Sequence, residues 1–145
     1  MIGQDQRLTL KHRTASLLLA GACLLAAAPA AVSQQAKPQP ASLEGSWSGG
    51  GTVVFPSGSR EKARCRATFR RQTSSSFAMS AVCATPSGRI AQTAALSRTS
   101  ANRFSGGFYN AEYATSGSIA IIVNGNRMTA SLSGGGASAR LSLSR

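Results

Sequence analysis

Few side chains in this sequence belong to the types that enzymes use for acid, base or nucleophilic chemistry. The only histidine, His12, and the only aspartate, Asp5, lie in an N-terminal leader that we expect to be cleaved. The rest of the chain keeps two cysteines and three glutamates. Without an imidazole there is no Ser-His or Cys-His pair and no histidine ligand for a metal, and general acid-base catalysis loses its commonest agent. We therefore expect no catalytic residues, no metal site and no cofactor.

A pair of carboxylates is the enzymatic alternative that remains. Glu61 stands among basic residues, and nothing in the spacing brings Glu44 or Glu112 beside it. The sequence therefore favours a protein that is not an enzyme.

The pattern that says most about function is a run of cations at alternate positions. Five of them have even residue numbers, and we call this one parity: Arg60, Lys62, Arg64, Arg66 and Arg70. Cys65, Ala67 and Phe69 take the other parity. On a strand, side chains of one parity share a face about 6.6 Å apart, where unit charges repel by about 0.6 kcal/mol even in bulk water. Because Glu61 has the wrong parity to neutralise them, the pattern predicts an anion-binding face; a solvated strand face that discourages edge pairing is the alternative.

Net charge points to the same kind of partner. The chain has 16 Lys and Arg against four acids; three of these cations and one acid fall in the leader, which leaves a net charge of +10. This predicts an anionic partner, namely an envelope polymer, lipid head groups or an acidic protein; a biased genome composition is the alternative. Nucleic acid is disfavoured, because single-strand binders need exposed aromatic platforms and only Trp47, Tyr109 and Tyr113 are candidates.

Residues 1–33 have the composition of an export signal. Three cations precede the apolar run Ala15–Val32, and Ala31–Ser33 offers small residues for cleavage before Gln34, with Ala28–Ala30 as a competing site. A membrane span and acylation at Cys23 are the alternatives. The sequence thus predicts a periplasmic or secreted protein with no transmembrane span in the mature chain.

Residues 34–42 have two prolines and no periodic apolar residues, which predicts a flexible tether before a domain at 43–145. In that domain apolar and polar residues alternate between regularly spaced turn signals, as in an antiparallel meander. We expect eight strands near 46–55, 61–71, 77–84, 89–97, 103–109, 117–123, 126–133 and 136–144. Eight up-and-down strands with one apolar face close most naturally into a small barrel, because closure removes the exposed edges. The fold class is therefore all-β.

The register of the second hairpin follows from its cysteines. A turn centred on Ser74 places Cys65 opposite Cys83 and Phe69 opposite Met79, so that one register aligns both thiols with the apolar residues. In an exported chain these cysteines are expected to form a disulfide; two free buried thiols are the alternative.

The other hairpins follow from their glycines. A two-residue type I′ turn at Asn124-Gly125 would place Ile121 opposite Met128, and a turn at Gly134-Gly135 would place Met128 opposite Leu141. A four-residue turn at 55–58 would turn Trp47, Val53 and Phe55 away from the Cys65 face, so we expect a β-bulge at Gly49–Gly51.

The expected interior is filled by its own side chains, as is usual for a barrel of this size. Large residues alternate with small ones along the inward parity, and no ligand cavity is evident. Gln92 is the lone polar side chain on that parity, and we interpret it as a hydrogen-bonded core amide.

The motif Gly45-Ser46-Trp47, at the start of the first strand of an eight-strand meander, resembles the opening of lipocalin-like barrels. The leader, the tether and the cysteine pair narrow this resemblance to the small bacterial barrels that include the Inh-type metalloprotease inhibitors. It would cover residues 43–145, and it implies that Gln34–Ser42 enters a protease active site. The chain departs from those inhibitors at Ala84–Gly88, where a second tryptophan is missing, and Trp47 would then simply plug one end of the barrel.

The sequence predicts a non-enzymatic, exported binding module that uses a basic strand face. An Inh-like inhibitor of a secreted protease, acting through the tether, is the alternative.

Overall fold

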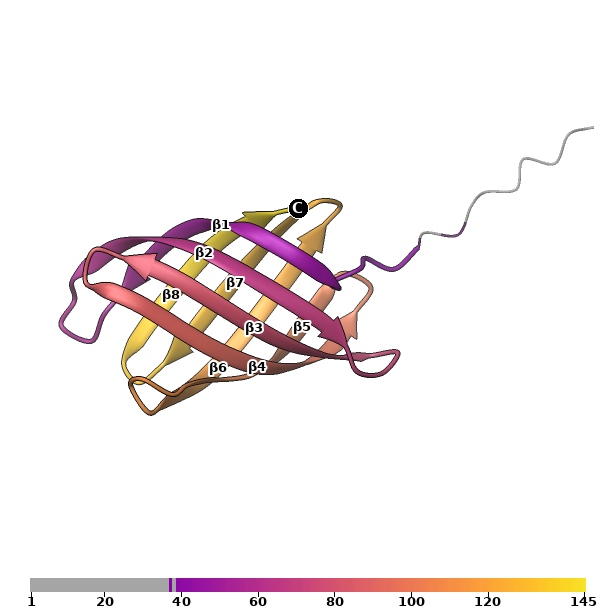
Figure 1. The fold of residues 1–145 in the computed structure, drawn as a ribbon. Helices are drawn as coiled ribbons and strands as arrows, with labels where there is room; N and C mark the ends of the chain where they lie inside the picture. Colours follow the sequence, from indigo (N-terminus) through magenta and orange to yellow (C-terminus); the bar gives the residue numbers. More distant parts are fainter. Residues whose placement is uncertain (1–36, 38) are drawn as a thin grey trace, which may run out of the picture. The chain divides into compact units, whose positions relative to one another are not determined.

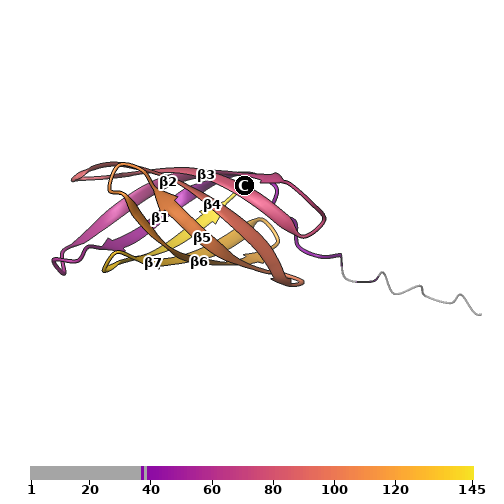
Figure 2. The same ribbon diagram turned by 90° about the horizontal axis from the view of Figure 1, so that it is seen from below.

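The computed structural model describes residue 37 and residues 39–145, and within them eight antiparallel strands form a closed sheet. The strands are β1 (Gly45–Val54), β2 (Arg60–Arg71), β3 (Ser76–Thr85), β4 (Gly88–Ser100), β5 (Arg103–Asn110), β6 (Thr115–Asn124), β7 (Arg127–Gly134) and β8 (Ala137–Ser144). Each strand pairs with the next, and β1 also pairs with β8 (Figures 1 and 2). The predicted up-and-down barrel is confirmed.

The predicted leader and residues 34–36 and 38 of the predicted tether lie outside the described residues. The part of the chain that the structure describes has no helix long and apolar enough to cross a membrane.

Burial follows the two-residue period of the strands. Along β2 the apolar residues between Ala63 and Phe69 are buried, and the cations between them are exposed. The interior is one cluster of buried apolar side chains. Phe77 and Phe104 meet in it edge to face, with ring centroids 5.3 Å apart, an arrangement that aromatic quadrupoles favour.

The barrel has two different ends. In an up-and-down chain, alternate loops lie at the same end. The loops after β1, β3, β5 and β7 form what we call the open end, at the left in Figure 1. The loops after β2, β4 and β6 form the closed end, which Trp47 fills with only 1% of its surface exposed. The Trp47 Nε1 group donates a hydrogen bond to the Leu43 carbonyl (2.9 Å). The prediction that Trp47 plugs one end is confirmed.

Arginines cover the aromatic residues of the closed end. The Arg145 guanidinium carbon lies 4.4 Å from the centre of the Trp47 ring, and that of Arg98 lies 4.6 Å from the Phe104 ring. Arg71 lies 5.3 Å from the Phe77 ring. These contacts fall within the range of cation–π attraction.

The predicted β2–β3 register is confirmed. Cys65 pairs with Cys83, and Phe69 pairs with Met79. The two cysteines form a disulfide, with Cα atoms 4.0 Å apart.

Two other predicted hairpin registers were wrong by two residues. The loop between β6 and β7 is Gly125-Asn126, so Val123 rather than Ile121 pairs with Met128. Here only Gly125 has a positive φ (59°), the pattern of a type II′ turn rather than the predicted type I′. The loop between β7 and β8 is likewise Gly135-Gly136, and Met128 pairs with Leu143. A shift of two residues keeps the same side chains facing inward, and the displaced register also buries Val123.

The predicted bulge at Gly49–Gly51 was also wrong. The β1–β2 ladder is continuous, and the loop has five residues, 55–59, instead of four, which keeps Trp47 and Val53 on the inward parity. The glycines allow close backbone approach instead, since a Cβ on Gly51 would lie 1.9 Å from the Arg140 carbonyl oxygen of β8. The register irregularity of the barrel falls between Arg98 and Ser100.

Removing the disulfide should destabilise the barrel. Replacing Cys65→Ala and Cys83→Ala together frees a loop with a sequence separation of 18, which should lower the free energy of unfolding by about 3 kcal/mol in the chain-entropy model. Urea denaturation of both proteins measures the change. A reductant should lower the midpoint of the wild type and leave that of the double variant unchanged; a wild-type midpoint insensitive to complete reduction would contradict the prediction.

Candidate functional site

The five cations predicted on β2 lie together on the outside of the barrel. All are exposed: Arg60, Lys62, Arg64, Arg66 and Arg70. We call them the basic face. Ala63, Cys65, Ala67 and Phe69, which alternate with exposed positions, are buried, and this alternation of the strand directs the long cationic side chains into solvent.

The neighbours of the basic face are small and uncharged. Gly50 and Ala84 flank Arg64 on the adjoining strands, and Ser48 and Val82 flank Arg66. Within the described residues the one ion pair is Arg71–Glu44 (3.3 Å), at the closed end. The Lys62 Nζ group donates to the Thr52 hydroxyl (3.4 Å). The charges of the basic face therefore stand without a carboxylate partner in this part of the chain.

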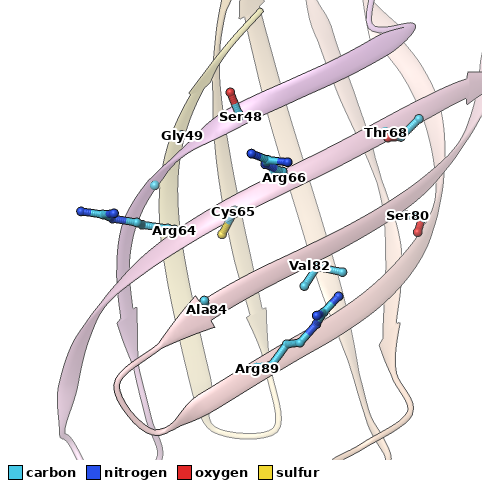
Figure 3. A pocket seen from close by; sticks show the side chains of 11 residues that line it. Ser48, Gly49, Arg64, Cys65, Arg66, Thr68, Ser80, Val82, Ala84 and Arg89 are labelled. Carbon is cyan, nitrogen blue, oxygen red and sulfur yellow. The ribbon is translucent and has the colours of Figure 1, made fainter.

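A broad, open groove of about 900 Å³ crosses the outer surface at this point. Arg64, Arg66 and Arg89 line it, with hydroxyls from three strands, and the three guanidinium groups point in different directions (Figure 3). Arg89 was missed by the sequence reasoning. It pairs with Ala84 across the β3–β4 hairpin, so extending that hairpin from its turn signal would have found it.

The three glutamates of the described chain have other contacts. Glu44 pairs with Arg71. The Glu112 carboxylate accepts a hydrogen bond from the Ala91 N–H (3.4 Å). Glu61 accepts hydrogen bonds from the Ser87 hydroxyl and from the Ser87 N–H (3.1 Å). The Ser87 hydroxyl is the main reason that the pKa of Glu61 is lowered from its ordinary value, with desolvation acting in the opposite direction.

The barrel interior is not completely filled, contrary to the sequence prediction. A cavity of about 360 Å³ lies at the open end, with mainly apolar walls. Its apolar lining includes Val53, Phe55, Ile90, Phe108, Leu132, Ala139 and Leu141. Gln92 also lines the cavity, and no hydrogen bond of its side-chain amide is found among the described residues, so its interpretation as a bonded core amide was wrong. Small residues of β7, β8 and the loop between them leave the space open, namely Gly134, Gly135, Ala137 and Ala139.

The segment before β1 packs on the closed end. The Ala41 N–H donates to the Ala101 carbonyl (3.1 Å), Leu43 is fully buried, and Lys37 is exposed. Protease inhibition through residues 34–42 stays a prediction.

Comparison with known proteins identifies the fold and no family. No family model matches the chain, and no curated protein matches it. Solved structures that resemble it are designed barrels. One is described as "Structure of a redesigned beta barrel, mFAP1, bound to DFHBI", with a TM-score of 0.61, 13% identity, and coverage of 71% of this chain and 94% of that chain. Another, a de novo designed "fluorescence-activating beta barrel", has a TM-score of 0.55, 10% identity, and coverage of 70% and 92%.

These matches define the class of protein as an eight-stranded antiparallel barrel. The resemblance drawn from Gly45-Ser46-Trp47 is thus confirmed for the fold, whereas membership of the lipocalin-like or Inh-type families is not shown.

The Ser87 contact should set the titration of Glu61. Because the folded pKa of Glu61 is lowered, the contact stabilises the fold above the ordinary pKa, and this contribution is lost as the pH falls through the lowered value. Ser87→Ala should therefore raise the pKa of Glu61 towards its ordinary value, measured by NMR titration of the carboxyl carbon. Ser57→Ala, in the loop after β1, is the matched control and should leave that titration unchanged. An unaltered Glu61 pKa in Ser87→Ala would show that the hydroxyl is not the cause.

Proposed function

We propose that this protein is an exported, non-enzymatic binding protein whose basic face holds an anionic polymer of the cell envelope. The observation that carries the proposal is the set of exposed cations on β2, which have no carboxylate partner among the described residues. Exposed positive charges without a partner raise the local concentration of anions and speed the association of anions with the protein.

The arrangement of the groove favours an extended ligand. Arg64, Arg66 and Arg89 point in different directions (Figure 3), and they belong to two strands with a third strand between them. A compact anion would contact one guanidinium at a time, whereas a polymer with repeated negative groups can reach several at once and gain by multivalency. Ser48, Thr68 and Ser80 add hydroxyl donors along the way.

Two further observations support the other parts of the proposal. Each of the three carboxylates has its own partner. Glu44 pairs with Arg71 at the closed end, whereas at the open end Glu61 bonds to Ser87 and Glu112 to Ala91. These separate contacts support a protein that does not catalyse a reaction with a pair of carboxylates. The Cys65–Cys83 disulfide is typical of oxidising compartments and supports export to the periplasm or beyond.

Charge removal at the centre of the groove should weaken binding to an anionic polymer. Arg64→Gln with Arg66→Gln should reduce the affinity for heparin about tenfold at low salt, at roughly 0.7 kcal/mol for each exposed charge. Titration calorimetry measures this effect, and the wild-type affinity should fall as salt rises because exposed charges are screened.

The matched control removes the same charge elsewhere. Arg103 and Arg127 are exposed on β5 and β7, so Arg103→Gln with Arg127→Gln should weaken heparin binding much less. Equal losses in the two variants, or an affinity insensitive to salt, would refute the assignment of the basic face. Tighter binding to phosphatidylglycerol vesicles than to heparin would indicate lipid head groups instead of a polymer.

A second candidate function is the binding of a small molecule inside the barrel. The cavity at the open end favours it, because about 360 Å³ lies within the range of ligand sites, which are concave, mostly apolar and few in each protein. Two designed barrels of the same fold were solved bound to the small molecule DFHBI, which supports small-molecule binding by a barrel of this fold.

The cavity should bind a neutral fluorescent probe. Prodan, an uncharged naphthyl ketone, should gain intensity and shift to the blue when it leaves water for the apolar cavity. Ala139 is half-buried in the wall, so Ala139→Phe should fill the space and abolish the change without altering heparin binding. An unaltered prodan signal in that variant would place the probe outside the cavity.

A further inference from the structure

Two side-chain amides lie next to each other on the wall of the cavity. The β4–β5 ladder ends towards the open end at the pair Thr93–Tyr109, and Gln92 and Asn110 occupy the next position on each strand. Both line the cavity, as the two-residue period requires, since the preceding inward pair is Ala94–Phe108. The amides therefore face the same space at the point where the two strands separate.

These amides keep unused hydrogen-bonding capacity. Asn110 is 5% exposed and is the one buried polar side chain among the described residues. Its Oδ1 accepts a hydrogen bond from the Tyr113 N–H (3.0 Å), which fixes its orientation. Among the hydrogen bonds of the described residues, none is donated by its Nδ2 group and none involves the Gln92 amide. No fully buried side-chain nitrogen or oxygen of the described residues lacks a partner, so the free amide atoms are open to a solvent-sized probe, and the space that both residues line is the cavity.

The charges around the cavity select against an ionised ligand. No charged side chain of residue 37 or residues 39–145 lines it, and the cations of the basic face point outward from the barrel. The carboxylates of the open end, Glu61 and Glu112, accept hydrogen bonds from Ser87 and Ala91. An ion that entered would lose its hydration without gaining a counter-ion, which costs far more than burying a neutral polar group that finds a hydrogen bond.

The remaining wall suits a flat or compact apolar body. Phe55, Ile90 and Phe108 provide aromatic and aliphatic surface, and Ala137 and Ala139 leave room beside them. Tyr113 lines the cavity although 60% of its surface is exposed, so it stands at the mouth.

We infer that the cavity binds an uncharged small molecule with an apolar body and a carboxamide or similar neutral group that pairs with Gln92 and Asn110. This rests on the second candidate function above and adds the chemical class of the ligand to it. The carbonyl oxygen of such a group would accept a hydrogen bond from an amide N–H of the wall, and its N–H would donate one to the Gln92 carbonyl oxygen.

Three probes with one ring system separate the alternatives. 2-Naphthamide carries the neutral hydrogen-bonding group, 2-naphthoate carries a charge in its place, and 2-methylnaphthalene carries neither. Dissociation constants for the full-length mature protein come from NMR titration, which also reports the side-chain NH₂ signals of Gln92 and Asn110. We expect 2-naphthamide to bind at least about tenfold more tightly than 2-naphthoate, and to shift both NH₂ signals.

Gln92→Met is the informative variant, because methionine keeps the length of the side chain and removes its amide. In this variant the affinity for 2-naphthamide relative to 2-methylnaphthalene should fall about fivefold, as expected for one lost hydrogen bond. Binding of 2-methylnaphthalene should persist and shows that the variant folds with its cavity intact. Gln72→Met, which changes an exposed residue of the loop after β2, is the matched control and should leave the ratio unchanged.

Each other outcome overturns the inference in a distinct way. If 2-naphthoate binds most tightly, the ligand class is anionic. If Gln92→Met leaves the ratio unchanged, or the NH₂ signals do not move, the amides take no part and only the apolar cavity remains. If none of the probes binds to the wild type, the inference and the candidate cavity function fail together.

Discussion

The alternation of side chains along each strand, in a sheet closed by pairing between β1 and β8, is the constraint on which this structure depends. Closure leaves no free edge and gives every strand an inside and an outside. On β2 that division is sharp, with Cys65 and Ala67 buried beside exposed Arg64 and Arg66. The buried disulfide and the exposed cations therefore depend on the same strand register. A slip of one residue would turn the cations inward and the cysteines outward.

The same division separates two chemically different surfaces in a small domain. Charge gathers on the outer surface, where water lowers the cost of placing cations side by side. The space inside is lined by apolar groups, a few hydroxyl side chains and two amides, Gln92 and Asn110, with no charged side chain from the described part of the chain. An anionic partner and a neutral one would thus meet the protein on opposite faces of one sheet, and neither would need to displace the other.

Much of this arrangement could be predicted from the sequence because period-two alternation is a local property. The fold class, the outward parity of the β2 cations and the Cys65–Cys83 pair all follow from it. Turn conformation is less well determined, because Asn124-Gly125 and Gly125-Asn126 both place a glycine in a two-residue loop and differ by a shift that keeps the same face inward. Alternation alone does not choose between them.

The cavity could not be found in this way, and Arg89 required the register of a hairpin as well as the alternation within one strand. Whether an interior is full depends on how eight strands tilt and on which small residues meet, such as Gly134 and Ala137 across the β7–β8 hairpin. That is a property of the closed barrel. Likewise, Arg89 joins the groove through its neighbour Ala84 on another strand, and a strand read in isolation does not reveal its lateral neighbours.

The closed end holds the start of β1 and the end of β8. The Ala41 N–H donates a hydrogen bond to the Ala101 carbonyl, and the Arg145 guanidinium donates one to the Glu44 carbonyl (2.9 Å), so residues 41 and 145 both lie at this end, across the barrel from the cavity mouth. A fusion partner, affinity tag or surface linkage joined at either of these residues would sit at the far pole and leave the mouth unobstructed. This geometry makes the domain suitable for immobilisation with its cavity facing free solution.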